Sequence, residues 1–225
     1  MRVAGRVELS PRRRIDLGRD RVSVDGKAVR DPTERVVLAF HKPVGLITAR
    51  TDPAGRPTIY DRLEDVGRWV FPVGRLDRDS AGLLLLTNDH RLGHRLADPA
   101  HRVSKTYHVR VRGVPAEEAL RVLREGVDIG DGMPTRRARV RLLGAARGGA
   151  TWLEVVLTEG RNRQVRRMCA TVGHDVLELA RVRIGSLSLG DLAPGEWRRL
   201  EPGEVAELFK EGPRWRGDPG RPQAT

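Results

Sequence analysis

The sequence contains almost no cysteine and no histidine pattern typical of a metal site. Cys169 is the only cysteine, which excludes an intramolecular disulfide and a cysteine-based zinc site. The six histidines are scattered, and none lies at metal-ligand spacing from a carboxylate-rich segment. We therefore expect a protein that works without a metal ion.

Long apolar runs and aromatic residues are also scarce. No stretch reaches the roughly 18 apolar residues of a membrane span, and no signal peptide opens the chain. Aromatic residues make up only 4%, too few for a surface that stacks several bases of a single strand. These absences predict a cytoplasmic protein with no membrane partner.

Positive charge is abundant instead. Lys and Arg number 42 against 30 Asp and Glu, which gives a net charge of +12 and a pI of about 11.1. Nearly all of the excess is arginine, whose guanidinium matches phosphate oxygens, so nucleic acid is the first candidate partner. The alternative is that a GC-rich genome has raised arginine usage.

The hydrophobic pattern predicts an α+β fold. The 225 residues suffice for one sizeable core or for a small domain joined to a larger one. Residues 20–29 alternate around Asp25-Gly26, which is typical of a hairpin, and Asn162 is expected to cap a helix that Gly173 ends. Strands are expected over 36–45, 82–87, 105–113, 137–142 and 151–160, and further helices over 90–99, 115–126 and 204–209. This order favours a largely antiparallel central sheet with flanking helices.

The segment VGRLDRDSAGLLLLTND (73–89) places charged residues directly before the most apolar run of the chain. Leu83 to Leu86 predict a buried strand, and Gly74 allows a tight turn ahead of it. Asp77 is therefore expected at the mouth of a rigid core, where a catalytic side chain has little freedom. The ordinary alternative is a surface ion pair between Asp77 and its neighbouring arginines.

Two further segments carry candidate functional residues. EGRNRQVRRM (159–168) is expected to place Arg163 and Arg166 on one helix face, with Arg167 beside them. A solvated basic face or a phosphate-binding stripe has the same pattern. Tyr107 is the lone aromatic residue of the alternating strand KTYHVRVRG (105–113), and core packing is the alternative for it.

Together these segments resemble a known family. GRLDRDSAGLLLLTND, KTYHVRV and EGRNRQVRRM, in this order and with FHKPVG and GEWRRL at either end, are similar to the RsuA/RluB/RluE/RluF family of ribosomal-RNA pseudouridine synthases. The resemblance covers roughly residues 36 to 200. It implies the pseudouridine synthase catalytic fold and an isomerase that converts specific uridines of ribosomal RNA, with a lean toward 23S RNA, to pseudouridine.

The resemblance also implies roles for single residues. Asp77 matches the catalytic aspartate, Tyr107 the tyrosine that stacks on the target base, and Arg166 the basic residue that pairs with the aspartate. The target uridine must be flipped out of its structured RNA, and the isomerisation needs neither cofactor nor metal. We expect the RNA contacts to come from a set of basic residues: Arg12, Arg13, Arg14, Lys42, Arg75, Lys105, Arg161, Arg163 and Arg167.

The domain organisation departs from the family pattern at the start of the chain. Residues 1–35 resemble only the end of an S4 RNA-binding domain, so we expect a remnant of that domain or a basic N-terminal arm. The catalytic domain is expected over 36–211, before a disordered tail over 212–225, and the protein is expected to be a monomer. Two other functions stay open: the same chemistry on transfer RNA or 16S RNA, and RNA binding or ribosome assembly without turnover.

Overall fold

The computed structural model describes residues 1–10, 12–16, 19–29, 35–146 and 148–209. The chain divides into two compact units, Met1–Arg35 and Val36–Thr225. The predicted disordered tail over 212–225 lies outside the described residues. Within the described residues, no helix is long and apolar enough to cross a membrane.

The first unit is a small antiparallel sheet. Its strands β1 (Arg2–Val3), β2 (Arg6–Val7), β3 (Val22–Val24) and β4 (Lys27–Val29) lie in the order β2-β1-β3-β4. The predicted hairpin is confirmed, because β3 pairs with β4 and both Asp25 and Gly26 have a positive φ, as a type I′ turn requires. That this unit is the remnant of an S4 domain stays a prediction.

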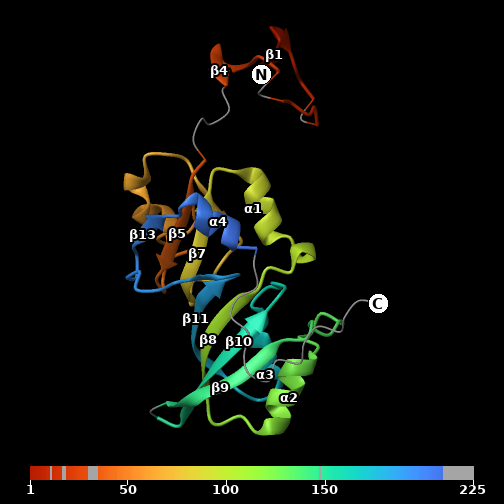
Figure 1. Cartoon of the computed structure of the whole chain (residues 1–225), viewed down its shortest axis with the longest axis vertical. Helices are drawn as coiled ribbons and strands as arrows, with labels where there is room; N and C mark the ends of the chain where they lie inside the picture. Colours follow the sequence, from red (N-terminus) through yellow and green to blue (C-terminus); the bar gives the residue numbers. More distant parts are fainter. Residues whose placement is uncertain (11, 17–18, 30–34, 147, 210–225) are drawn as a thin grey trace. The chain divides into compact units, whose positions relative to one another are not determined.

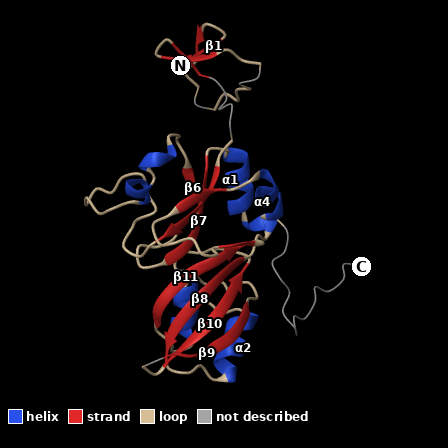
Figure 2. Ribbon diagram, turned by 60° about the vertical axis from the view of Figure 1, so that its left-hand side comes forward, coloured by secondary structure: helices blue, strands red, loops and turns tan. Residues whose placement is uncertain are grey.

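The second unit is built on one mixed sheet. Its strands are β5 (Val37–Lys42), β6 (Phe71–Val73), β7 (Ala81–Thr87), β8 (Lys105–Arg112), β9 (Arg139–Ala146), β10 (Ala150–Leu157), β11 (Val176–Ile184), β12 (Leu187–Ser188) and β13 (Trp197–Arg199). The main path runs β13-β5-β7-β11-β8-β10-β9, while β6 pairs with β7 and β12 with β11 (Figure 2). Only β7 and β11 are parallel, so the predicted α+β class with a largely antiparallel sheet is confirmed.

Strand β7 explains the run of four leucines. Leu84 and Leu86 pack on one face of the sheet and Leu83 and Leu85 on the other, and none of the four is exposed. A strand that is buried on both faces reads as a continuous apolar run rather than an alternating one. Gly82 lets β7 approach β11, since a Cβ there would lie 2.3 Å from the Arg181 carbonyl oxygen.

The face that carries Leu84 and Leu86 has a cluster of its own, which we call the Leu84 cluster. Two short 3₁₀ turns, Ile59–Arg62 and Glu64–Val66, cover it. Its buried members are Val36, Leu38, Phe40, Leu46, Ile59, Leu63, Val66, Val70, Leu76, Leu84 and Leu86. On the opposite face, α1 (His90–Ala97) and α4 (Pro202–Glu207) pack beside β7 (Figure 1).

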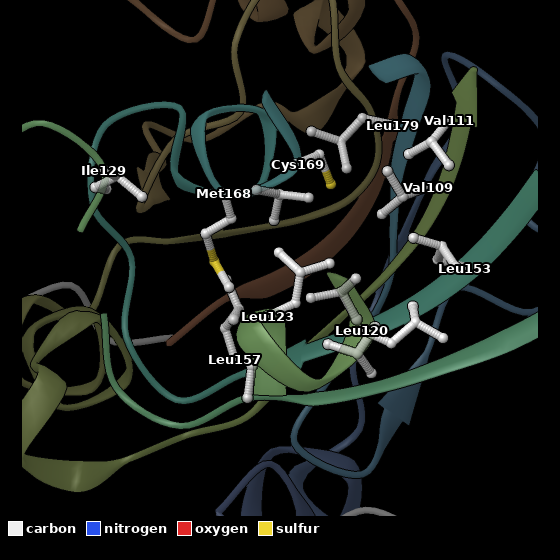
Figure 3. Close-up of a cluster of buried hydrophobic side chains, with 14 residues drawn as sticks. Val109, Val111, Leu120, Leu123, Ile129, Leu153, Leu157, Met168, Cys169 and Leu179 are labelled. Atoms are coloured by element: carbon white, nitrogen blue, oxygen red, sulfur yellow. The ribbon is translucent and has the colours of Figure 1, made fainter. Parts of the chain in front are cut away.

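The other half of the sheet is covered by α2 (Glu117–Glu125) and α3 (Gln164–Thr171). Leu120 and Leu123 of α2 meet Val165 and Met168 of α3 over β8 and β10 (Figure 3). We call this group the β8 cluster; it also holds Val109, Val111, Ile129, Ala138, Val140, Leu153, Val155, Leu157, Cys169 and Leu179. The predicted helix over 115–126 begins two residues later than expected, at Glu117, and the last predicted helix begins earlier, at Pro202.

Candidate active site

The loop between β6 and β7 presents Asp77 on a fixed backbone. Gly74 adopts a φ of 75°, which side-chain-bearing residues rarely take, and begins the turn. Leu76 is buried, and its backbone N–H and C=O both bond to the Thr48 hydroxyl, at 3.3 and 2.8 Å. The Ser80 N–H donates to the Asp77 carbonyl at 3.0 Å and closes the turn. The Asp77 side chain is 33% exposed, so the carboxylate faces solvent while its backbone is tied to the core.

Lys42 supports this loop from below. Its side chain is fully buried at the end of β5, and its Nζ donates to the carbonyl oxygens of Pro43 at 3.1 Å, Asp77 at 3.0 Å and Ser80 at 2.8 Å. Burial lowers the pKa of Lys42 to about 8, against the attraction of the Asp77 and Asp79 charges. The prediction that Lys42 contacts RNA is wrong, because an ammonium with no exposed surface cannot reach a phosphate.

Two arginines meet the carboxylates of the loop. Arg163 donates to both oxygens of Asp79, at 3.1 and 3.0 Å, and its Nη1 lies 3.6 Å from Oδ2 of Asp77. Arg166 donates from Nη2 to the Asp79 carbonyl at 2.7 Å, and its Nε lies 3.3 Å from Asp79 Oδ2 without hydrogen-bond geometry. Burial opposes ionisation of Asp79, but the hydrogen bond from Arg163 and the charges of both arginines lower its pKa overall. The predicted pairing of Arg166 with Asp77 is therefore wrong: Arg163 makes that contact.

The start of α3 explains this exchange of partners. The helix begins at Gln164, and the residue that precedes it, Arg163, has a left-handed backbone with a φ of 48°. The predicted cap at Asn162 is wrong, and Arg163 does not share a helix face with Arg166. Gln164 instead closes the loop, since its side chain accepts from the Arg161 N–H at 2.9 Å and donates to buried Glu159 at 2.7 Å. Sequence periodicity carries no signal for a left-handed residue other than glycine.

Tyr107 lies at the junction of the two halves of the sheet. It is half-buried in β8, and its ring packs against both the β8 cluster and the Leu84 cluster, which contains Leu76, the neighbour of Asp77. Its hydroxyl has no hydrogen-bond partner among the described residues. The ring therefore borders the loop that carries Asp77, and core packing accounts for only part of its surface.

The other predicted RNA contacts differ in how accessible they are. Arg75 is exposed on the loop itself, whereas burial and the charge of Arg181 lower the pKa of half-buried Lys105 to about 8. Arg161 is occupied by its own loop, because it donates to Asp131 and to two carbonyl oxygens at 2.8 and 2.9 Å.

Arg167 lies 3.9 Å from Asp131. Arg12, Arg13 and Arg14 are exposed in the first unit, where Arg13 pairs with Glu8 at 2.8 Å. Among the residues that the structure describes, no three metal-ligating side chains come together.

Comparison with known proteins identifies relatives over most of the chain. Residues 36–171 match the model of a family described as RNA pseudouridylate synthase. A ribosomal large subunit pseudouridine synthase B of Bacillus subtilis (strain 168) is 38% identical over 192 residues, covering 85% of this chain and 78% of the relative. A ribosomal large subunit pseudouridine synthase E of Xanthomonas campestris is 45% identical over 177 residues, covering 72% and 94%.

Solved structures agree with these relatives. A crystal structure of a pseudouridylate synthase superimposes with a TM-score of 0.73 at 30% identity, over 92% of this chain and 87% of that one. A human protein described as RNA pseudouridylate synthase domain containing 1 has a TM-score of 0.53 at 15% identity, which shows a shared fold.

Proposed function

Because this chain belongs to the RNA pseudouridylate synthase family and is thereby an RNA isomerase, we propose that its substrate is ribosomal RNA and that Asp77 is its catalytic carboxylate. The relatives of types B and E are named for the large ribosomal subunit, which favours 23S RNA over 16S RNA and transfer RNA. The observation that carries the assignment of Asp77 is its setting: an accessible carboxylate, next to an arginine, on a loop whose backbone is held at three points.

The reaction requires one carboxylate and no outside group. The N1–C1′ bond of uridine breaks, the uracil turns over, C5 bonds to C1′, and the proton on C5 ends on N1, so atoms and electrons balance. Asp77 would act in the first step, either by attacking C1′ or by removing the 2′ proton. Carboxylates serve oxocarbenium-like centres in related ways in glycosidases. The Arg163 guanidinium 3.6 Å away favours the ionised form that either route needs.

Tyr107 and Arg166 receive different parts. The Tyr107 ring would support the flipped uracil, and its hydroxyl, which has no partner among the described residues, would remove the C5 proton. Arg166 would act on Asp77 only through Asp79, which it holds by backbone and side chain. Arg163 would thus replace Arg166 as the partner of the catalytic carboxylate.

The N-terminal unit would supply binding rather than chemistry. Arg12, Arg13 and Arg14 are exposed there and would contact phosphates, which add affinity without reading sequence. We expect the protein to act as a monomer on ribosomal RNA in the cytoplasm.

The test is release of tritium from 23S RNA transcribed with [5-³H]uridine. Asp77→Asn keeps the shape of the side chain but lacks the charge, so it should bind RNA and release no more than a trace. Asp191→Asn, in an exposed turn, is the matched control and should behave as wild type. Turnover by Asp77→Asn would refute the assignment. Release from 16S or transfer RNA but not from 23S RNA would change the substrate, and RNA binding by wild type without release from any of them would favour a non-catalytic binding protein.

A further inference from the structure

A second surface of the catalytic unit combines two of its few aromatic rings with an arginine. The rings of Tyr60 and Trp69 are stacked, with centroids 5.3 Å apart and planes within 4° of parallel. The Arg50 guanidinium carbon lies 4.3 Å from the Trp69 centroid and 5.8 Å from that of Tyr60. Trp69 is nevertheless 52% exposed, which is unusual for the largest apolar side chain.

The three distances indicate that one face of Trp69 is open. If Arg50 and Tyr60 lay on opposite faces of the indole, they would be separated by nearly the sum of their distances to it. They are only 5.8 Å apart, so both lie toward the same side. The ring borders a groove of about 420 Å³ whose lining includes the charged residues Arg50, Arg68 and Glu64.

The stack is rigid and is joined to the Asp77 loop by two segments of chain. The Tyr60 hydroxyl donates to the Val70 carbonyl at 3.0 Å, and burial raises the pKa of this hydroxyl, which keeps it neutral. Trp69 directly precedes Val70 and β6, and β6 leads into the Asp77 loop. Arg50 follows Thr48, the residue bonded to Leu76, by two positions, which span at most about 7 Å.

The chemistry of this surface matches a nucleobase. A base stacks on an exposed indole face and on a guanidinium plane, and unpaired bases are what most sequence-specific RNA-binding sites take up. The low aromatic content excludes a surface for many bases, but one Trp with one Arg suffices for a single base. The target uridine belongs at Tyr107, on a different strand, so the base at Trp69 must be another nucleotide of the same RNA.

We propose that Trp69 and Arg50 bind an unpaired base of the RNA substrate close to the target uridine and thereby contribute to substrate selection. The proposal rests on the proposed function for the presence of an RNA substrate. It assigns to this surface affinity and not chemistry, which distinguishes it from Asp77 and Tyr107.

Steady-state kinetics on the tritiated 23S RNA test the site. Trp69→Leu removes the stacking face and should raise KM about 5- to 150-fold, the range for one stacked base, with kcat unchanged. Trp69→Phe keeps an aromatic face and should recover most of the affinity. Val114→Ala, which trims another exposed apolar side chain, is the control and should leave KM as it is.

A second measurement keeps the proposal falsifiable if Trp69→Leu folds poorly. The emission that wild type has and Trp69→Phe lacks comes from Trp69, and 23S RNA should quench it. No quenching, or a Trp69→Leu protein of normal melting temperature with wild-type KM, overturns the stacking site. Wild type that releases no tritium from any RNA would instead overturn the proposed function, so the two failures are distinct.

Discussion

Lys42→Met tests whether the buried lysine holds the catalytic loop in place. The substitution keeps the unbranched length of the side chain but removes all three hydrogen bonds to the carbonyls of Pro43, Asp77 and Ser80. Each buried acceptor left without a donor costs about 1–3 kcal/mol, and loss of a buried charged partner typically costs about 3–5 kcal/mol. Removal of a poorly solvated charge offsets part of this loss, so we expect the free energy of unfolding to fall by about 3 kcal/mol.

The loss of activity should exceed the loss of folded protein. Two of the three carbonyls belong to the turn that carries Asp77, and a displacement of about 1 Å at a reacting group can cost about 100-fold in rate. Urea unfolding and single-turnover tritium release, measured where Lys42→Met is folded, separate the two effects. Lys27→Met, at an exposed lysine of β4, is the control. A folded Lys42→Met protein with wild-type stability and turnover would refute the role assigned to Lys42.

The pH dependence of stability gives an independent reading of the same group. Burial lowers the pKa of Lys42 from 10.5 to about 8, so between these values the unfolded chain binds more protons than the folded one. Stability then rises with pH, because the cost of a buried ammonium disappears as Lys42 loses its proton. The unfolding free energy of wild type, minus that of Lys42→Met, should rise between pH 8 and 10.5 by at most about 1.4 kcal/mol per pH unit. Lys105, with a pKa of about 8, titrates in both proteins and cancels in the difference; a flat or falling difference would contradict the assignment.

Two other perturbations test the remaining parts of the proposed mechanism. Tyr107→Phe should keep its melting temperature and the ring under the base but slow the late removal of the C5 proton by about 10²- to 10⁴-fold, and near-normal single-turnover rates would leave Tyr107 with packing alone. Replacing Arg12, Arg13 and Arg14 together by Ala should reduce the log–log salt slope of RNA binding by about 0.7–0.9 for each phosphate that the protein no longer neutralises, without changing turnover at saturating RNA, and an unchanged slope would remove this segment from the interface.

The fold was predictable wherever local pattern and tertiary packing agree. The Asp25-Gly26 hairpin and the buried strand β7 follow from short-range rules, because a type I′ turn needs positive φ and a strand buried on both faces needs a continuous apolar run. The order of the strands was not predictable from pattern. The parallel contact of β7 with β11 joins segments about a hundred residues apart, and its only local trace is the glycine at position 82.

The candidate site was predictable as a set of segments but not as a set of contacts. Lys42 has the charge of an RNA-binding residue, and only the structure shows that three carbonyls surround it. The stack at Trp69 was missed for a related reason, since the average aromatic content of a chain says nothing about two rings that a fold brings within 5.3 Å of each other. Charge and composition indicate the class of ligand, whereas burial decides which of the charges can reach it.

The two carboxylates of the loop divide the arginines unequally, and this division suits the role proposed for Asp77. Asp79 accepts both of the hydrogen bonds that Arg163 donates to carboxylate oxygens and is also contacted by Arg166, while Asp77 has one ion contact at 3.6 Å and accepts no side-chain hydrogen bond among the described residues. A carboxylate held by a guanidinium through two hydrogen bonds has its lone pairs occupied and is a poor nucleophile or base. Asp79 therefore neutralises the arginines and fixes them beside Asp77, whose oxygens stay available for the sugar of the flipped uridine.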